Sequence, residues 1–182
     1  MGLISPDVLQ KLNEKWQELL NKDEGEAIKK VICIDGKTMR SNKREEIKPL
    51  HIVSAWSKED GFCLGQKAVS EKSNEITAIP ELLDKIQIKG QIITIDAIGT
   101  QVSIAEKIKG KRADYVLALK GNQKSLYEDV KEFFENKEFC ANLEKEGHYK
   151  KTKEKAHSQI ETREYYQTDN IKWLSQKKNG KA

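Results

Sequence analysis

The stretch KKVICIDGKTMR, residues 29–40, decides the fold because an apolar run ends there in a polar segment, Asp35-Gly36-Lys37-Thr38. Two phosphate chemistries fit this pattern at first sight. A Gly-Lys-Thr triplet after a strand can close a nucleotide-binding P-loop, and an aspartate at the end of a buried strand can hold a metal ion. The P-loop motif requires a glycine five positions before the Gly-Lys pair, where this chain has Val31. The spacing therefore excludes the P-loop and leaves Asp35 as a candidate metal ligand.

The composition indicates one soluble domain with exposed parts. The chain has 182 residues, with 37% hydrophobic and 34% charged residues, a low apolar share for a compact globule. Its three cysteines, Cys33, Cys63 and Cys140, are far apart, which argues against a disulfide framework or a zinc ribbon. No apolar run reaches the roughly 18 residues of a membrane span. We expect a soluble cytoplasmic protein without membrane contact.

The positive charge is concentrated near the C-terminal end. Residues 137–182 hold 11 Lys and Arg against 7 Asp and Glu, so the preceding residues hold 22 of each and the net charge of +4 lies in the tail. Such an excess leans toward an anionic partner such as nucleic acid, but a solvated Lys/Glu-rich surface is the simpler explanation.

Alternating and helical periodicities predict an α/β fold. Short apolar or alternating runs predict strands, and runs with an apolar stripe at helical spacing predict helices. A first helix is predicted at 5–21. The elements that follow are strands at 31–35, 50–56 and 62–69, a helix at 74–86, a strand at 91–96, a helix at 99–108, a strand at 114–120 and a helix at 122–136. This β-β-β-α-β-α-β-α order implies a hairpin-led sheet continued by parallel strands.

A second aspartate, Asp96, ends the apolar run IITID as Asp35 ends VICID. Ligands of α/β sheets gather at the carboxyl ends of parallel strands, so these two carboxylates can share divalent cations such as Mg²⁺. An aspartate at a strand end also caps turns, and that simpler interpretation stays open at this point. His51 lies within a predicted strand and is interpreted as structural.

Five segments together resemble the catalytic core of bacterial ISAs1-type transposases, which include the H-repeat-associated proteins. They are ICIDGKTMR, LHIVSAW, LGQKAVSEKSNEITAIPELLD, ITIDAIGTQ and YVLALKGNQKSLYEDV, and the resemblance covers roughly residues 12–170. It implies a DDE transposase with an RNase H-like mixed sheet and helices on both faces. Asp35 and Asp96 are then the first two catalytic carboxylates, which bind Mg²⁺ or Mn²⁺. In such enzymes the metals activate water for strand nicking and then a DNA 3′-hydroxyl for strand transfer.

DNA, in particular transposon ends, is the partner that the resemblance implies, and a homo-oligomer is a family expectation. Cationic and amide side chains predicted at the same sheet edge are candidate DNA contacts: Lys37, Arg40, Lys120, Asn122 and Gln123. A solvated loop explains the lysines and the arginine equally well, and a helix cap is the simpler explanation for Asn122.

This sequence differs from the family at the third catalytic carboxylate. Family members carry it as a glutamate in an HW-x-IEN-x-LHW segment, and this sequence has no such segment. Glu161 and the acidic residues at 128–132 are weaker substitutes. We therefore predict a transposase fragment, truncated at both ends and inactive alone, with a helix and linker at 1–30, a core at 31–136 and a basic, partly β insertion segment at 137–182. Alternatives are a non-catalytic DNA-binding or interaction remnant, and an unrelated metal-dependent nuclease or phosphatase.

Overall fold

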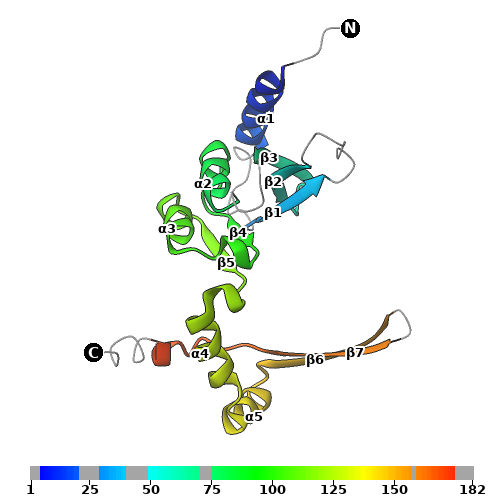
Figure 1. The fold of residues 1–182 in the computed structure, drawn as a ribbon, viewed down its shortest axis with the longest axis vertical. Coiled ribbons are helices and arrows are strands. Elements are labelled where there is room, and N and C mark those ends of the chain that lie inside the picture. Colours follow the sequence, from blue (N-terminus) through cyan, green and yellow to red (C-terminus); the bar gives the residue numbers. More distant parts are fainter. Residues whose placement is uncertain (1–4, 21–28, 40–48, 70–74, 157–158, 175–182) are drawn as a thin grey trace. The chain divides into compact units, whose positions relative to one another are not determined.

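The computed structural model describes residues 5–20, 29–39, 49–69, 75–156 and 159–174 (Figure 1). The chain forms two compact units, one ending at Asn122 and the other beginning at Gln123. The division into 1–30, 31–136 and 137–182 stays a prediction. No helix in the described residues combines the length and apolar character needed to cross a membrane.

The first unit is built on a five-stranded mixed sheet in the order β3-β2-β1-β4-β5. Its strands are β1 (Val31–Met39), β2 (Leu50–Ser57), β3 (Phe62–Val69), β4 (Ile92–Ile95) and β5 (Asp114–Leu117). The first three strands pair antiparallel, and β4 and β5 continue the sheet in parallel with β1. Gly61 closes the β2–β3 hairpin at φ 71°, a left-handed conformation that favours glycine. This is the predicted α/β class with the RNase H-like strand order.

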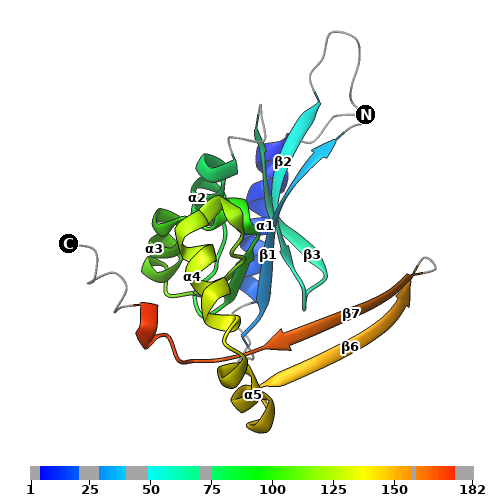
Figure 2. The same cartoon turned by 60° about the horizontal axis from the view of Figure 1, so that its bottom comes forward.

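Helices cover one face of this sheet. The first unit contains α1 (Pro6–Leu20), α2 (Glu75–Lys85), the short helix η3 (Ala97–Gly99) and α3 (Val102–Gly110). Figure 2 shows α2 and α3 on the same side of the sheet. The core on that side consists of alternate strand residues and the apolar stripes of the two helices, among them Ile32, Ile34, Val53, Ile79, Leu82, Leu83, Ile93, Ile95, Ile104 and Ile108. Alternation along the strands therefore leaves the intervening side chains on the opposite face.

Helix α1 lies against the edge strand β3. The Trp16 ring stacks on Phe62 with the ring centroids 4.9 Å apart. The Asn13 amide donates hydrogen bonds to the carbonyls of Cys63 and Leu64, at 3.2 and 3.0 Å. These contacts confirm the predicted N-terminal helix and show where part of its side chains pack.

The second unit contains more regular structure than the sequence suggested. It holds α4 (Lys124–Phe134), α5 (Lys137–Lys145) and a hairpin of β6 (Tyr149–Ala156) with β7 (Gln159–Tyr166); the short helix η4 (Gly121–Gln123) spans the unit boundary. Rings of Phe133, Phe139 and Trp173 pack together, with centroid distances of 4.4 Å from Phe133 to each of the other two. A strand at 158–167 was expected, whereas α5 and β6 were not, because charged residues interrupt both elements.

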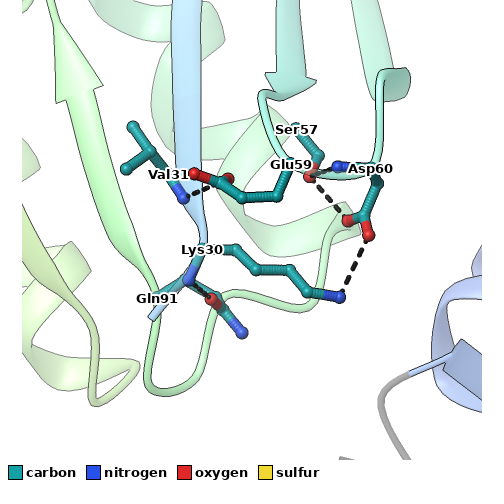
Figure 3. A network of polar contacts seen from close by, with 6 residues as sticks. All are labelled: Lys30, Val31, Ser57, Glu59, Asp60 and Gln91. Carbon is teal, nitrogen blue, oxygen red and sulfur yellow. Dashed lines mark hydrogen bonds and ion pairs between the residues drawn. The ribbon is translucent and has the colours of Figure 1, made fainter. Parts of the chain in front are cut away.

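A polar network fixes the beginning of β1 (Figure 3). The backbone N–H of Lys30 donates to Gln91 Oε1 at 2.6 Å, and that of Val31 donates to Glu59 Oε2 at 2.7 Å. The Lys30 ammonium lies 3.0 Å from Asp60 Oδ1, and both side chains are largely covered, at 13% and 22% exposure. The network joins the start of β1 to the β2–β3 turn and to the segment before β4.

The Asp60 carboxyl makes this network sensitive to acid. Burial acts to raise its pKa, but hydrogen bonds from Ser57 and Lys30 and the Lys30 charge together hold the pKa below its ordinary value of 3.8. A depressed folded-state pKa contributes stability above the unfolded-state pKa, and this contribution is lost as the pH falls through the folded-state value. We expect Asp60→Asn to flatten the acid limb of the unfolding free energy below about pH 4, measured by urea denaturation. An equally steep limb in the variant would contradict this assignment.

Candidate metal centre

Strand register places the two predicted carboxylates side by side. β1 and β4 pair in parallel from Val31↔Ile92 to Ile34↔Ile95. Asp35 is the next residue of β1, and Asp96 is the first residue after β4. Neighbouring strands lie about 4.8 Å apart. Ile34 and Ile95 are both buried in the core, so alternation directs the next side chains to the opposite face, and both aspartates are exposed. The carboxylates therefore leave adjacent strands toward the same face.

Asp35 itself lies inside its strand, which corrects the predicted strand end. β1 continues to Met39, and residues 35–39 pair with β2 alone because β4 has ended. Among the described residues no side chain forms a hydrogen bond or ion pair with the Asp35 carboxylate.

Asp96 is held at the turn between β4 and η3. It caps η3, accepting a hydrogen bond from the Ile98 N–H at Oδ1 over 3.1 Å. Thr100 Oγ1 donates to the Ala118 carbonyl at 2.6 Å, and the Asn122 amide donates to the Ala97 carbonyl at 2.5 Å. These bonds tie the turn after β4 to the segment after β5, so the Asp96 backbone is fixed from two sides.

The arrangement fits a divalent cation with oxygen ligands. Mg²⁺ is commonly bound by one or two carboxylates, with waters and substrate phosphates completing its shell. Asp35 offers both oxygens and Asp96 offers at least Oδ2, since only Oδ1 accepts the capping bond. Within the described ranges no three or more His, Cys, Asp or Glu side chains gather at a metal-binding distance. Among the described residues, Asp35 and Asp96 are the two carboxylates of the candidate centre.

The predicted DNA-contacting residues divide into four cases. Lys37 and Lys120 are exposed, and Lys37 lies on the same strand face as Asp35 by alternation. The Asn122 amide is engaged with Ala97, and it is neither free nor a cap of α4. Gln123 belongs to the second compact unit. Arg40 lies outside the described residues.

Sequence reasoning missed a buried pair on the other side of β1. His51 Nε2 lies 2.5 Å from Glu75 Oε1, with only 3% and 4% of the two side chains exposed. The other ring nitrogen, Nδ1, lies 2.9 Å from Thr38 Oγ1. His51 is thus buried and structural, as predicted. Glu75 begins an amphipathic helix, where a solvated charge would be the ordinary expectation, so pattern alone could not place it inside.

The His51–Glu75 pair packs so closely against Gly36 that this position has no room for a side chain. A Cβ on Gly36 would lie 2.4 Å from Glu75 Oε1 and 2.8 Å from His51 Nε2. We expect Gly36→Ala to lower the free energy of unfolding by about 1–3 kcal/mol, the usual cost of overpacking, in urea denaturation. The matched control is Gly110→Ala at the end of α3, where nothing lies within 4 Å of the added Cβ. Equal stability of the two variants would contradict the tight packing at Gly36.

The mixed sheet with strand order β3-β2-β1-β4-β5 defines an RNase H-like α/β fold. Comparison of the sequence with family models identifies the family: residues 26–179 match the Transposase DDE domain. The chain belongs to this family.

Known relatives carry the same description. The chain is 47% identical over 135 residues to the proposed transposase YncI of Escherichia coli K12, covering 73% of this chain and 53% of YncI. It is 49% identical over 112 residues to the H repeat-associated proposed transposase YhhI of the same organism, covering 60% of this chain and 30% of YhhI. The match spans only about half of the length of YncI from Escherichia coli K12 and of a Xanthobacter autotrophicus relative.

A similar solved structure is an intasome of simian T-cell lymphotropic virus in complex with the PP2A regulatory subunit B56 gamma. It has a TM-score of 0.40 and 12% sequence identity, and the match covers 62% of this chain and 44% of that chain.

Proposed function

We propose that this chain is the catalytic-core segment of an ISAs1-type transposase, which acts on DNA by metal-dependent strand cleavage and transfer. The observation that supports the proposal is the parallel register of β1 with β4, which ends at Ile34↔Ile95, one residue before Asp35 and Asp96. Both residues lie in the part of the chain that matches the transposase family.

In this proposal Asp35 and Asp96 hold Mg²⁺ or Mn²⁺. When bound, such ions activate an attacking oxygen and stabilise the leaving oxygen of a phosphodiester. The chain's own contribution is positional: β1 and β4 fix the spacing of the ligands, and the Asp96 cap fixes the turn. The exposed ammonium groups of Lys37 and Lys120 supply sequence-independent contacts to DNA phosphates.

A second candidate function is a non-catalytic DNA-binding remnant. It is favoured by one observation, namely that no third acidic or histidine side chain joins Asp35 and Asp96 within the described residues. On this basis we propose that the chain alone has weak or no transposition chemistry. Metal binding is therefore a better test of the site than turnover.

Mn²⁺ titration tests the site without requiring activity. We expect Asp35→Asn and Asp96→Asn each to weaken Mn²⁺ binding by at least about tenfold, since each removes one of two charged oxygen ligands. The control is Asp114→Asn at the start of β5, whose carboxylate is ion-paired with Lys29 and Lys109. Isothermal titration calorimetry gives the affinities. Unchanged binding in both site variants would remove Asp35 and Asp96 from the metal centre, and any nicking activity that survives Asp35→Asn would do the same for catalysis.

Salt dependence tests the DNA contacts separately. Each phosphate contact adds about 0.9 to the slope of log K against log salt, because binding releases condensed counterions. We expect Lys37→Ala and Lys120→Ala each to lower this slope by about 1 for duplex DNA of any sequence. Lys109→Ala is the control, since Lys109 is ion-paired with Asp114. Fluorescence anisotropy at several salt concentrations measures the slope, and identical slopes in all four proteins would rule out both lysines as phosphate contacts.

A further inference from the structure

The feature that the proposed chemistry leaves unused is the buried pair of Glu75 and His51. Glutamate is almost never fully buried unless it is paired, and here its partner is the imidazole 2.5 Å away. Thr38 satisfies the second ring nitrogen at 2.9 Å. No buried side-chain nitrogen or oxygen in the described residues lacks a hydrogen-bond partner. The three side chains thus form a closed polar network.

This network joins three elements around the backbone that follows Asp35. Thr38 comes from β1, His51 from β2, and Glu75 is the first residue of α2. The Glu75 carboxylate and the imidazole lie directly against Gly36, where even a Cβ would not fit. Since side chains alternate along a strand, Asp35 leaves the sheet on the face opposite to the one that Gly36 presents to the pair.

The network lies beside the part of β1 that has a neighbouring strand on one side only. Up to Ile34 the strand has neighbours on both sides, but from Asp35 to Met39 it pairs with β2 alone. A strand with one neighbour can twist away from the sheet, and a twist at Gly36 would turn the Asp35 carboxylate away from Asp96. The contact of the strand with Glu75 at the start of α2 replaces the missing neighbour.

Burial of such a pair is costly in itself. Well-packed apolar residues in place of a buried ion pair often give equal or greater stability, whereas removal of one partner is strongly destabilising. Stability alone therefore does not account for a buried polar pair at this position. A polar pair does restrict geometry, because its hydrogen bonds allow one arrangement of β1, β2 and α2.

We propose that Glu75 and His51 are positioning residues for the metal centre. They hold the Asp35-Gly36 backbone so that Asp35 stays in register with Asp96, and Thr38 fixes the orientation of the imidazole. The inference rests on the proposed function, because it assigns the pair a role toward a cation bound by these aspartates. Outer residues that orient metal ligands typically change metal affinity by 10–100-fold when they are replaced.

Mn²⁺ affinity of the full chain tests this role. We expect Glu75→Ala and His51→Ala to raise the Mn²⁺ dissociation constant by about tenfold or more. Glu75→Gln keeps an oxygen that accepts a hydrogen bond from the imidazole, so it should retain most of the affinity. The control for lost stability is Ile108→Ala, a fully buried α3 residue of the core. It should bind Mn²⁺ like the unaltered chain wherever it is folded.

A metal-free readout accompanies the titration. Hydrogen exchange of the peptide spanning residues 33–39 should accelerate in Glu75→Ala relative to the peptide of β4, while Ile108→Ala should show no such difference between the two peptides. If Glu75→Ala fails to fold, Thr38→Val provides the milder test, because Thr38 is exposed and the change removes only the hydroxyl that contacts His51. Thr38→Val should weaken Mn²⁺ binding measurably.

The outcomes separate the two proposals. If Asp35→Asn leaves Mn²⁺ affinity unchanged, the proposed function fails and the positioning role fails with it. If affinity depends on Asp35 but the folded variants of Glu75, His51 and Thr38 bind as tightly as Ile108→Ala, the proposed function stands and the positioning role alone is overturned.

Discussion

The parallel pairing of β1 with β4 is the constraint on which the candidate site depends. It ends at Ile34↔Ile95, so the next residue of β1 and the first residue after β4 are both exposed aspartates, Asp35 and Asp96. Because this pairing ends before Asp35, the backbone of Asp35 and the following residues is hydrogen-bonded to β2 alone. The buried His51–Glu75 pair lies beside this part of β1. On the β4 side, the Asn122 amide holds the turn after Asp96 by its hydrogen bond to the Ala97 carbonyl.

Two different sets of polar contacts hold the two ends of β1. The network of Lys30, Glu59 and Asp60 fixes the beginning of the strand, where the partly covered Lys30–Asp60 pair loses its stabilising contribution in acid. The pair of His51 and Glu75 lies in the interior near the other end, where an unpaired partner would be costly. Polar contacts thus hold β1 near both ends, and the candidate metal centre lies near the end that contacts His51 and Glu75.

Much of the first unit could be predicted from the sequence because its elements have clear periods. The helix at Glu75–Lys85 and the strand at Phe62–Val69 appear where alternation and helical spacing placed them. The continuation of β1 through Gly36 and Lys37 was missed, because these residues are typical of turns and only pairing with β2 keeps them extended. The Glu75–His51 contact was also beyond pattern reasoning, since it joins residues 24 positions apart that become neighbours only when α2 packs on the sheet. β6 was missed because its lysines conceal the strand period.

The central claim is that Asp35 and Asp96 share a divalent cation. The most direct measurement is a crystal structure of the full chain soaked with Mn²⁺, with the ion located by its anomalous scattering. We expect an anomalous peak between the two aspartates, with a carboxylate oxygen of each at about 2.0–2.2 Å, the usual range for small divalent cations. Carboxylates more than about 8 Å apart, or directed to opposite faces of the sheet, would contradict it, since paired ions in such sites lie about 4 Å apart.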